Sequence, residues 1–185
     1  RKAAQMLPVA MVAAGDCIGA LAPPQVAVMF RWPRTISVNG ASVGHVRVIS
    51  ATKDAGAVPD WLVVGADLRM RSGDGAAEPG TMPDTTTLGE EGCEDLSHVD
   101  IMASFARHFL TWLNIWQDDG FEPVHRSWLE RAEEPETARR FDGVSEPATI
   151  SGMDEDGNLL VRCGEETRML ALTDAIEIID AEAAR

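Results

Sequence analysis

Arg31, Trp32 and Pro33 follow one another at the end of an apolar run, and their types suit the binding of a ligand. Pro33 cannot donate a hydrogen bond to a sheet ladder, so it marks a strand end or a bulge. A rigid strand end is a good place from which to present side chains. The guanidinium of Arg31 keeps its charge and can grip a phosphate through two hydrogen bonds. We therefore predict an anion clamp at Arg31, with an ordinary strand-end arginine as the alternative, and Trp32 as either a pocket wall or a core residue.

Short β-strands must position these residues. The β-branched runs are Val26–Phe30 and Val43–Ile49, and a short strand, Ile36–Val38, is expected between them. Asn39 and Gly40 follow that strand. Asn-Gly between extended segments is a strong hairpin signal, because both residues tolerate positive φ. The stretch is therefore predicted to be a set of strands with a tight hairpin.

Three further segments belong to the first part of the predicted fold. A helix is expected from Pro8 to Leu21, because Pro8 suits a first turn and Gly19 with the prolines after it ends the helix. Trp61–Ala66 is a short apolar run, predicted to be a strand buried on both faces. Residues 71–94 are rich in Gly, Pro and acidic residues, so we expect a long, flexible or functional loop. Its acidic end is expected to be a solvated face, with a metal site as the alternative.

A long amphipathic helix is predicted after this loop. Ser97 and Asp100 resemble a capping box, and Gly120 closes the helix. A shorter helix is expected from about Glu122 to Arg131. Large apolar side chains follow the capping box at spacings of three and four, which gives one apolar stripe: Ile101, Phe105, Phe109, Trp112, Leu113 and Trp116.

The C-terminal part has the pattern of a small β-structure. Residues 133–143 are charged and contain proline, which is typical of a linker. Residues 148–153, 159–163 and 168–172 then alternate apolar and polar side chains, and a last strand is expected at residues 175–179. Several short strands at near-regular spacing predict a small barrel.

Charge and composition exclude several classes of protein. The net charge is −14, which argues against binding nucleic acid through its phosphates. No apolar run is long enough to span a membrane, and no signal peptide opens the chain. The three cysteines are odd in number and far apart, which suits a reducing, cytoplasmic environment without a disulfide framework. The chain begins at Arg1 rather than methionine, so a segment upstream is expected to be missing.

Three motifs resemble the biotin and lipoate protein ligases, and most closely a bacterial, ligase-like branch of unassigned activity. The central motif of that family reads roughly K-W-P-N-D, a short strand, a turn, then K-hydrophobic-G/A-G-I-L. The residues that match it are Trp32, Pro33, Asn39, Gly40, Val43 and Gly44. A later phrase, G-F-x-P-…-W-L-x-R-A, is matched by Gly120, Phe121, Pro123, Trp128, Leu129, Arg131 and Ala132. A third, G-x-D-x-x-G-x-L, belongs to an SH3-like cap and is matched by Gly152, Asp154, Gly157 and Leu159.

The resemblance implies an α+β fold. Residues 1–132 would form a catalytic-type domain of the class II synthetase and biotin protein ligase kind, a mixed β-sheet backed by helices, whose N-terminal part is not represented. Residues 133–143 would be a linker, and residues 144–185 a small SH3-like β-barrel.

The resemblance also implies a reaction. Such a ligase activates a small carboxylic acid, biotin or lipoate or a related one, with ATP and Mg²⁺, and passes the acyl group to a lysine of a carrier-protein domain. Arg31 stands in place of the catalytic lysine of the motif. The expected substrate and nucleotide pocket consists of Trp32, Pro33, Arg34, Asn39, Gly40, Gly44, His45, Gly65 and Asp67.

Several positions depart from the family pattern. Arg34 and Thr35 replace an Asn-Asp pair linked to the adenylate and Mg²⁺, and Ser42 replaces the second lysine. His45 stands where the family has glycine, and it should narrow the pocket unless it is a core histidine. A Gly/Arg-rich adenylate loop is absent from the chain. These departures predict an acid other than biotin. They also leave open a binding module that has lost adenylation.

Overall fold

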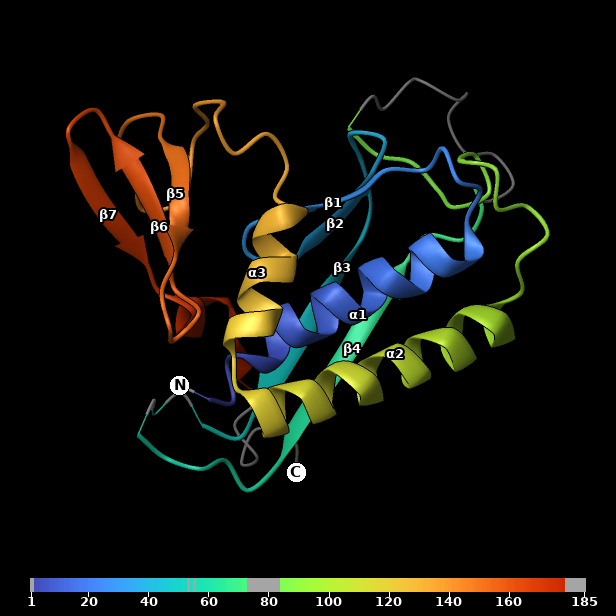
Figure 1. Cartoon of the computed structure of the whole chain (residues 1–185), viewed down its shortest axis with the longest axis horizontal. Coiled ribbons are helices and arrows are strands. Elements are labelled where there is room, and N and C mark those ends of the chain that lie inside the picture. The colour runs from blue at the N-terminus through green and yellow to red at the C-terminus, as the bar shows by residue number, and fades with distance from the viewer. Residues whose placement is uncertain (1, 53, 55, 73–83, 179–185) are drawn as a thin grey trace.

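The computed structural model describes residues 2–52, 54, 56–72 and 84–178, which fold into two β-sheets and three α-helices (Figure 1). The helices are α1 (Met6–Leu21), α2 (His98–Asp119) and α3 (Glu122–Glu130). The strands of the larger sheet are β1 (Val28–Arg31), β2 (Thr35–Val38), β3 (Ala41–Ser50), β4 (Leu62–Leu68) and β8 (Glu177–Ile178). The smaller sheet consists of β5 (Thr149–Met153), β6 (Leu159–Cys163) and β7 (Glu166–Leu170).

The larger sheet is mixed, as the resemblance implied. Strands β1 to β4 are neighbours in sequence order and antiparallel, whereas β8 pairs with β3 in parallel. The hairpin between β2 and β3 is confirmed: Asn39 and Gly40 have φ of 50° and 86°, and Val38 pairs with Ala41. The side chain of Asn39 also accepts a hydrogen bond from the backbone N–H of Ala27 at 3.0 Å, which ties the hairpin to the start of β1.

Helix α1 is the centre of the core. It packs on β1, β3 and β4 with one side and on α2 and α3 with another (Figure 1). Its residues from Met6 to Gly15 are buried all round, so the helix is apolar on every face rather than on one stripe. Two indole N–H groups hold α2 against it: Trp112 donates to Asp16 at 2.7 Å, and Trp116 donates to Gln5 at 2.8 Å. The predicted capping box of α2 is present, with Ser97 and Asp100 bonded reciprocally.

The segment after α3 runs beside β1. The backbone N–H of Phe30 donates to the carbonyl of Arg131 at 2.7 Å, and the N–H of Glu133 donates to the carbonyl of Phe30 at 2.9 Å. Phe30 and Ala132 form a parallel bridge. Trp128 of α3 is buried, and its ring stacks on Phe30. Residue 133, the first of the predicted linker, is therefore fixed against the larger sheet.

The predicted double burial of the strand around Trp61–Ala66 is wrong. Strand β4 pairs with β3, and helices cover one face of the sheet, so its alternate residues face solvent. Val63 is 52% exposed. The part of the following loop that the structure describes is packed rather than flexible, since Leu88 is fully buried and Thr85 forms a bridge to Ser42. Residues 73–83 of the predicted loop lie outside the described residues.

The last predicted strand is also placed differently. Residues 172–175 form a 3-10 helix, and β8 then joins the larger sheet beside Ile49 and Ser50. Burial of Leu172 and Ile176 draws this segment onto the core. The described part of the C-terminal region is a three-stranded antiparallel sheet, so the barrel stays a prediction. The division at residues 133–143 stays a prediction too, although one buried apolar cluster includes Leu159 and Val161 together with α1. Among the described residues, no helix is long and apolar enough to cross a membrane.

Candidate functional site

The face of the larger sheet that points away from α1 carries polar side chains. Strand alternation sends Phe30, Ile36 and Val46 into the core and their neighbours to the opposite face. The face that is not covered by helices, called the open face below, presents Arg31, Ser37, His45, Arg47 and Asp67. Three of the residues that the sequence singled out lie on this face: Arg31, His45 and Asp67.

Arg31 is held by its own chain. Its Nε and Nη2 both donate to the carboxylate of Glu133, the second at 3.1 Å, and Nη2 also donates to the carbonyl oxygen of Gly40. The hydroxyl of Ser37 lies 3.1 Å from the same carboxylate. Arg139 lies farther off, with Nη1 at 3.9 Å. The side chain of Glu133 is only 13% exposed, so this ion pair is partly shielded from water.

The predicted hairpin residues belong to this group. The carbonyl of Gly40 accepts from Arg31, as described above. The amide of Asn39 donates through Nδ2 to Glu91 at 2.6 Å, and its oxygen accepts from Ala27. Both residues therefore shape the hairpin, and Gly40 also holds Arg31. A ligand contact from either one stays a prediction.

The glycines on β3 and β4 differ in the space that the structure leaves for a side chain. A Cβ on Gly44 would lie 2.0 Å from the backbone oxygen of Asp67, so only glycine allows the two strands this approach. A Cβ on Gly65 would meet nothing within 4 Å, which leaves the surface above it open. His45 pairs across the strands with Asp67, with Nε2 3.3 Å from Oδ2. The His45 side chain is 41% exposed, so the alternative of a core histidine is wrong.

A second ion-pair cluster lies where β8 joins the sheet. Glu177 accepts from Arg34 at 2.7 Å and from Arg47 at 2.6 Å. The hydrogen bond from Arg47, assisted by Arg34, holds the pKa of Glu177 below its ordinary value despite partial burial. Arg34 is thus engaged in holding β8, and its predicted role in a substrate pocket stays a prediction.

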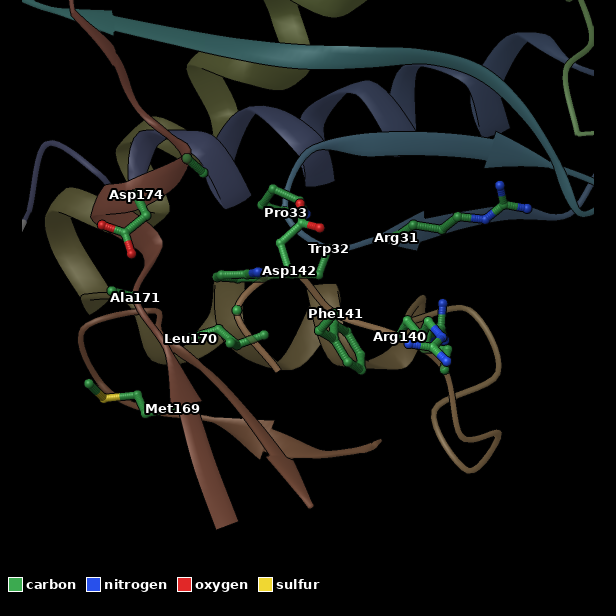
Figure 2. Close-up of a pocket in the computed structure, with 13 residues that line it drawn as sticks. Arg31, Trp32, Pro33, Arg140, Phe141, Asp142, Met169, Leu170, Ala171 and Asp174 are labelled. Atoms are coloured by element: carbon green, nitrogen blue, oxygen red, sulfur yellow. The ribbon is translucent and has the colours of Figure 1, made fainter. Parts of the chain in front are cut away.

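A cleft of about 700 Å³ opens beside the Arg31–Trp32–Pro33 turn (Figure 2). Its other walls come from residues 139–143 and 169–175, neither of which the sequence had singled out. Trp32 contacts both the core and the cleft. Its ring meets Trp128 of the core edge-on, with the ring centroids 6.1 Å apart, and it also lines the cleft. Figure 2 shows Phe141 and Arg140 across the cleft, and Arg31 stretched away from Trp32 and Pro33.

The ten predicted site residues therefore fall into neighbouring groups. Arg31, Trp32 and Pro33 line the cleft. Asn39 and Gly40 form the hairpin that holds Arg31, and Arg34 is bound to the C-terminal strand. The remaining four lie on β3 and β4: Gly44, His45, Gly65 and Asp67.

Sequence reasoning missed the two carboxylates that organise the site. Glu133 lies in a charged run that is typical of a linker, and Glu177 lies in a segment predicted to close a barrel. No local pattern distinguishes either from a solvated acid. Their importance comes from backbone pairing over more than a hundred residues.

Other chemistry finds little support among the described residues. They contain no group of three or more His, Cys, Asp or Glu side chains placed to hold a metal ion. Burial raises the pKa of the Cys17 and Cys93 thiols, which makes them weak nucleophiles at neutral pH. The site therefore combines three arginines of the larger sheet and its turns, each paired with a carboxylate of the same chain, with a cleft that Trp32 and Phe141 line.

Comparison with known proteins decides the family. The sequence model of the Biotin/lipoate A/B protein ligase family matches residues 1–130. The chain belongs to this family. A relative from Paracoccus denitrificans, a biotin--[acetyl-CoA-carboxylase] ligase, is 31% identical over an alignment of 167 residues that covers 86% of this chain and 67% of the relative.

Solved structures of similar proteins agree with this membership in the biotin/lipoate ligase family. A biotin protein ligase-like protein of unknown function from Silicibacter sp. TM1040 is 39% identical, with a TM-score of 0.83 over 95% of this chain and 74% of that one. Biotin protein ligase from Aquifex aeolicus, in complex with biotin and ATP, has a TM-score of 0.72 at 14% identity, over 90% of this chain and 67% of that one. At that identity the Aquifex protein shows a shared fold alone.

Proposed function

We propose that this chain works as an ATP-dependent ligase that activates a small carboxylic acid and transfers it to a lysine of a carrier protein. The observation that carries the proposal is the position of Arg31, a cation fixed on the open face where the family motif has its catalytic lysine. The 31% identity to the Paracoccus ligase supports the reaction class. In that reaction the acid's carboxylate attacks the α-phosphorus of ATP and pyrophosphate leaves. The lysine amine then attacks the acyl carbon, and AMP and a proton leave.

The residues of this chain have separable tasks in the proposed reaction. Arg31 would stabilise negative charge on a carboxylate or phosphate oxygen as the charge moves. Trp32 and Pro33 would wall the cleft against water, which protects a mixed anhydride from hydrolysis. His45 and Asp67 would limit the space over β3 and β4, which favours lipoate, octanoate or another related acid over biotin.

Arg34, at the Asn position of the motif, does not fit a metal ion. Mg²⁺ prefers oxygen ligands, whereas a guanidinium has no acceptor. Arg34 is moreover engaged with Glu177 at 2.7 Å. Arg34 therefore cannot serve as a ligand of the metal in this chain.

The proposal is tested by ATP–pyrophosphate exchange. The full-length protein is supplied with Mg²⁺ and, separately, with biotin, lipoate and octanoate, and incorporation of labelled pyrophosphate into ATP is measured. We expect exchange that depends on one acid, with lipoate or octanoate above biotin. Folded protein that gives no exchange with any of the three acids would contradict adenylation.

A second function, a binding module without adenylation, is favoured by one specific observation. Arg31, Arg34 and Arg47, all cations of the open face or its border, are already paired with Glu133 or Glu177. Such pairing reduces the charge available to a triphosphate. The module predicts quenching of tryptophan fluorescence by an acid without ATP, together with no exchange. The ligase predicts quenching by the acid and, in addition, pyrophosphate exchange.

A further inference from the structure

Glu133 is placed by backbone pairing rather than by chance. The Phe30 and Glu133 hydrogen bonds described above attach the segment after α3 to the edge of β1, one residue before Arg31. The Glu133 carboxylate consequently lies beside the Arg31 side chain, and Ser37 of β2 braces it from the adjacent strand at 3.1 Å. The Glu133 side chain is only 13% exposed and accepts hydrogen bonds from Arg31 and Ser37, which leaves the carboxylate little freedom to move.

A count of donors shows what this arrangement leaves free. A guanidinium has five N–H groups in a fixed fork. The single N–H of Nε is used by Glu133, and the two of Nη2 are used by Glu133 and the Gly40 carbonyl. Within the part of the chain that the structure describes, the two N–H groups of Nη1 make no hydrogen bond. Arg31 can therefore bind a ligand through one nitrogen, Nη1, and not through a bidentate pair of nitrogens.

The charges of the group support binding of an anion through that nitrogen. Arg31 and Glu133 cancel, but Arg139 lies 3.9 Å from the Glu133 carboxylate. The three side chains together keep one net positive charge in a partly shielded place. A single anionic oxygen can be held there, because charge-assisted hydrogen bonds are stronger than neutral ones.

We propose that Glu133 is a positioning residue that occupies the Nε–Nη2 edge of Arg31, so that Arg31 contacts the substrate as a single-point cation through Nη1. This inference rests on the proposed function and deepens it. An arginine held in this way can replace a lysine ammonium, because it contacts the ligand at a single point. The group that it binds is one oxygen of a carboxylate or phosphate. Glu133 thereby compensates for arginine at the motif position.

Substitutions of Arg31 and Glu133 should depend on each other. Arg31→Lys alone should be poorly active, since Glu133 would capture the ammonium. Glu133→Gln alone should raise KM more than it lowers kcat, because Arg31 loses its orientation. The double variant Arg31→Lys/Glu133→Gln should regain about tenfold over Arg31→Lys, because contacting residues couple by amounts of this order. Glu136→Gln, an exposed neighbour with the same change of charge, should behave as wild type.

Pyrophosphate exchange and thermal unfolding of all five proteins give the first test. Rescue in the double variant, with unchanged Glu136→Gln, supports the inference. Exchange by the wild type without any rescue overturns the role of Glu133 and leaves the proposed function intact. Loss of exchange in the wild type instead contradicts the proposed function, and the second test then decides the role of Glu133.

The second test does not need activity. The arginine side chains are labelled with ¹⁵N, and inorganic phosphate is titrated while the Nε and Nη resonances are followed by NMR. We expect the Arg31 Nη1 signal to shift and the Nε signal to stay, with this selectivity lost in Glu133→Gln. Equal shifts at both nitrogens would show a two-pronged grip and overturn the inference, as would no shift at all.

Discussion

Gly44 is required where it stands, because a single added carbon atom would not fit between β3 and β4. The Cβ that any other residue would add lies 2.0 Å from the Asp67 oxygen, closer than real atoms approach, whereas Gly65 two residues before Asp67 has open space around it. Both glycines belong to the pocket that the resemblance implies, so the sequence marked them equally. The structure separates them, because strand spacing rather than residue type sets the requirement.

Gly44→Ala should therefore destabilise the protein, and Gly65→Ala should not. Forcing a methyl group between β3 and β4 is expected to cost about 1–3 kcal/mol in the free energy of unfolding. Gly65→Ala serves as the matched control and should leave that free energy unchanged or slightly higher. Urea unfolding followed by tryptophan fluorescence measures both. Equal effects of the two substitutions would contradict the close approach of the strands.

Glu177 links stability to pH at the residue scale. Its pKa is lower in the folded chain than its ordinary value of 4.5, chiefly through the hydrogen bond from Arg47. A depressed pKa gives stability that is present above pH 4.5 and is lost as the pH falls through the folded pKa. The β8 strand should therefore loosen from β3 in acid.

Comparing Glu177→Gln with wild type tests this linkage. The variant should lose stability at pH 7, and the gap between the two proteins should narrow as the pH falls below 4.5. The urea midpoint at several pH values is the measurement, with Glu136→Gln as the control for charge. A gap that stays constant down to low pH would show that the Arg47–Glu177 pair contributes nothing.

At the scale of elements, local sequence signals were sufficient to predict structures that depend on contacts between residues close in sequence. The Asn39-Gly40 hairpin and the capping box of α2 depend on neighbours within four residues, and both are confirmed. The burial of β4 and the partner of β8 depend on which elements cover the sheet. That is a property of the assembled fold, so the periodicity of Trp61–Ala66 could not reveal it.

The cap of α2 should have a measurable share in stability. Ser97→Ala removes the acceptor for the Asp100 N–H, and such losses cost about 1 kcal/mol. Ser145→Ala, in an exposed loop, is the control for loss of a hydroxyl group. Thermal unfolding followed by circular dichroism at 222 nm reports both. A fall in Tm for Ser145→Ala as large as that for Ser97→Ala would argue against the cap.

At the scale of the whole molecule, one apolar core joins the two sheets. Gly157, in the turn between β5 and β6, approaches the core so closely that a Cβ would lie 2.7 Å from Leu172 and 3.2 Å from Phe121. Gln5 at the start of α1 donates to the Glu155 carbonyl at 2.9 Å. The division at residues 133–143 was inferred from their charged, proline-containing composition, and it stays a prediction.

Shared packing predicts one cooperative unfolding transition for the chain. Urea unfolding should give the same midpoint from tryptophan fluorescence, which reports the larger sheet and helices, and from exchange of amide protons in β5–β7. Earlier loss of protection in β5–β7 would show that residues 144–185 unfold separately, as an independent domain would.

The most direct test of the account is pyrophosphate exchange by the full-length protein with and without Arg31. With lipoate or octanoate, wild type should exchange label, and Arg31→Ala should lose activity by about a hundredfold, the scale of one lost charge-stabilising donor. Arg126→Ala, which removes an exposed arginine paired with Glu122 on α3, should keep full activity. Full exchange by Arg31→Ala would contradict the claim that this cation carries the chemistry.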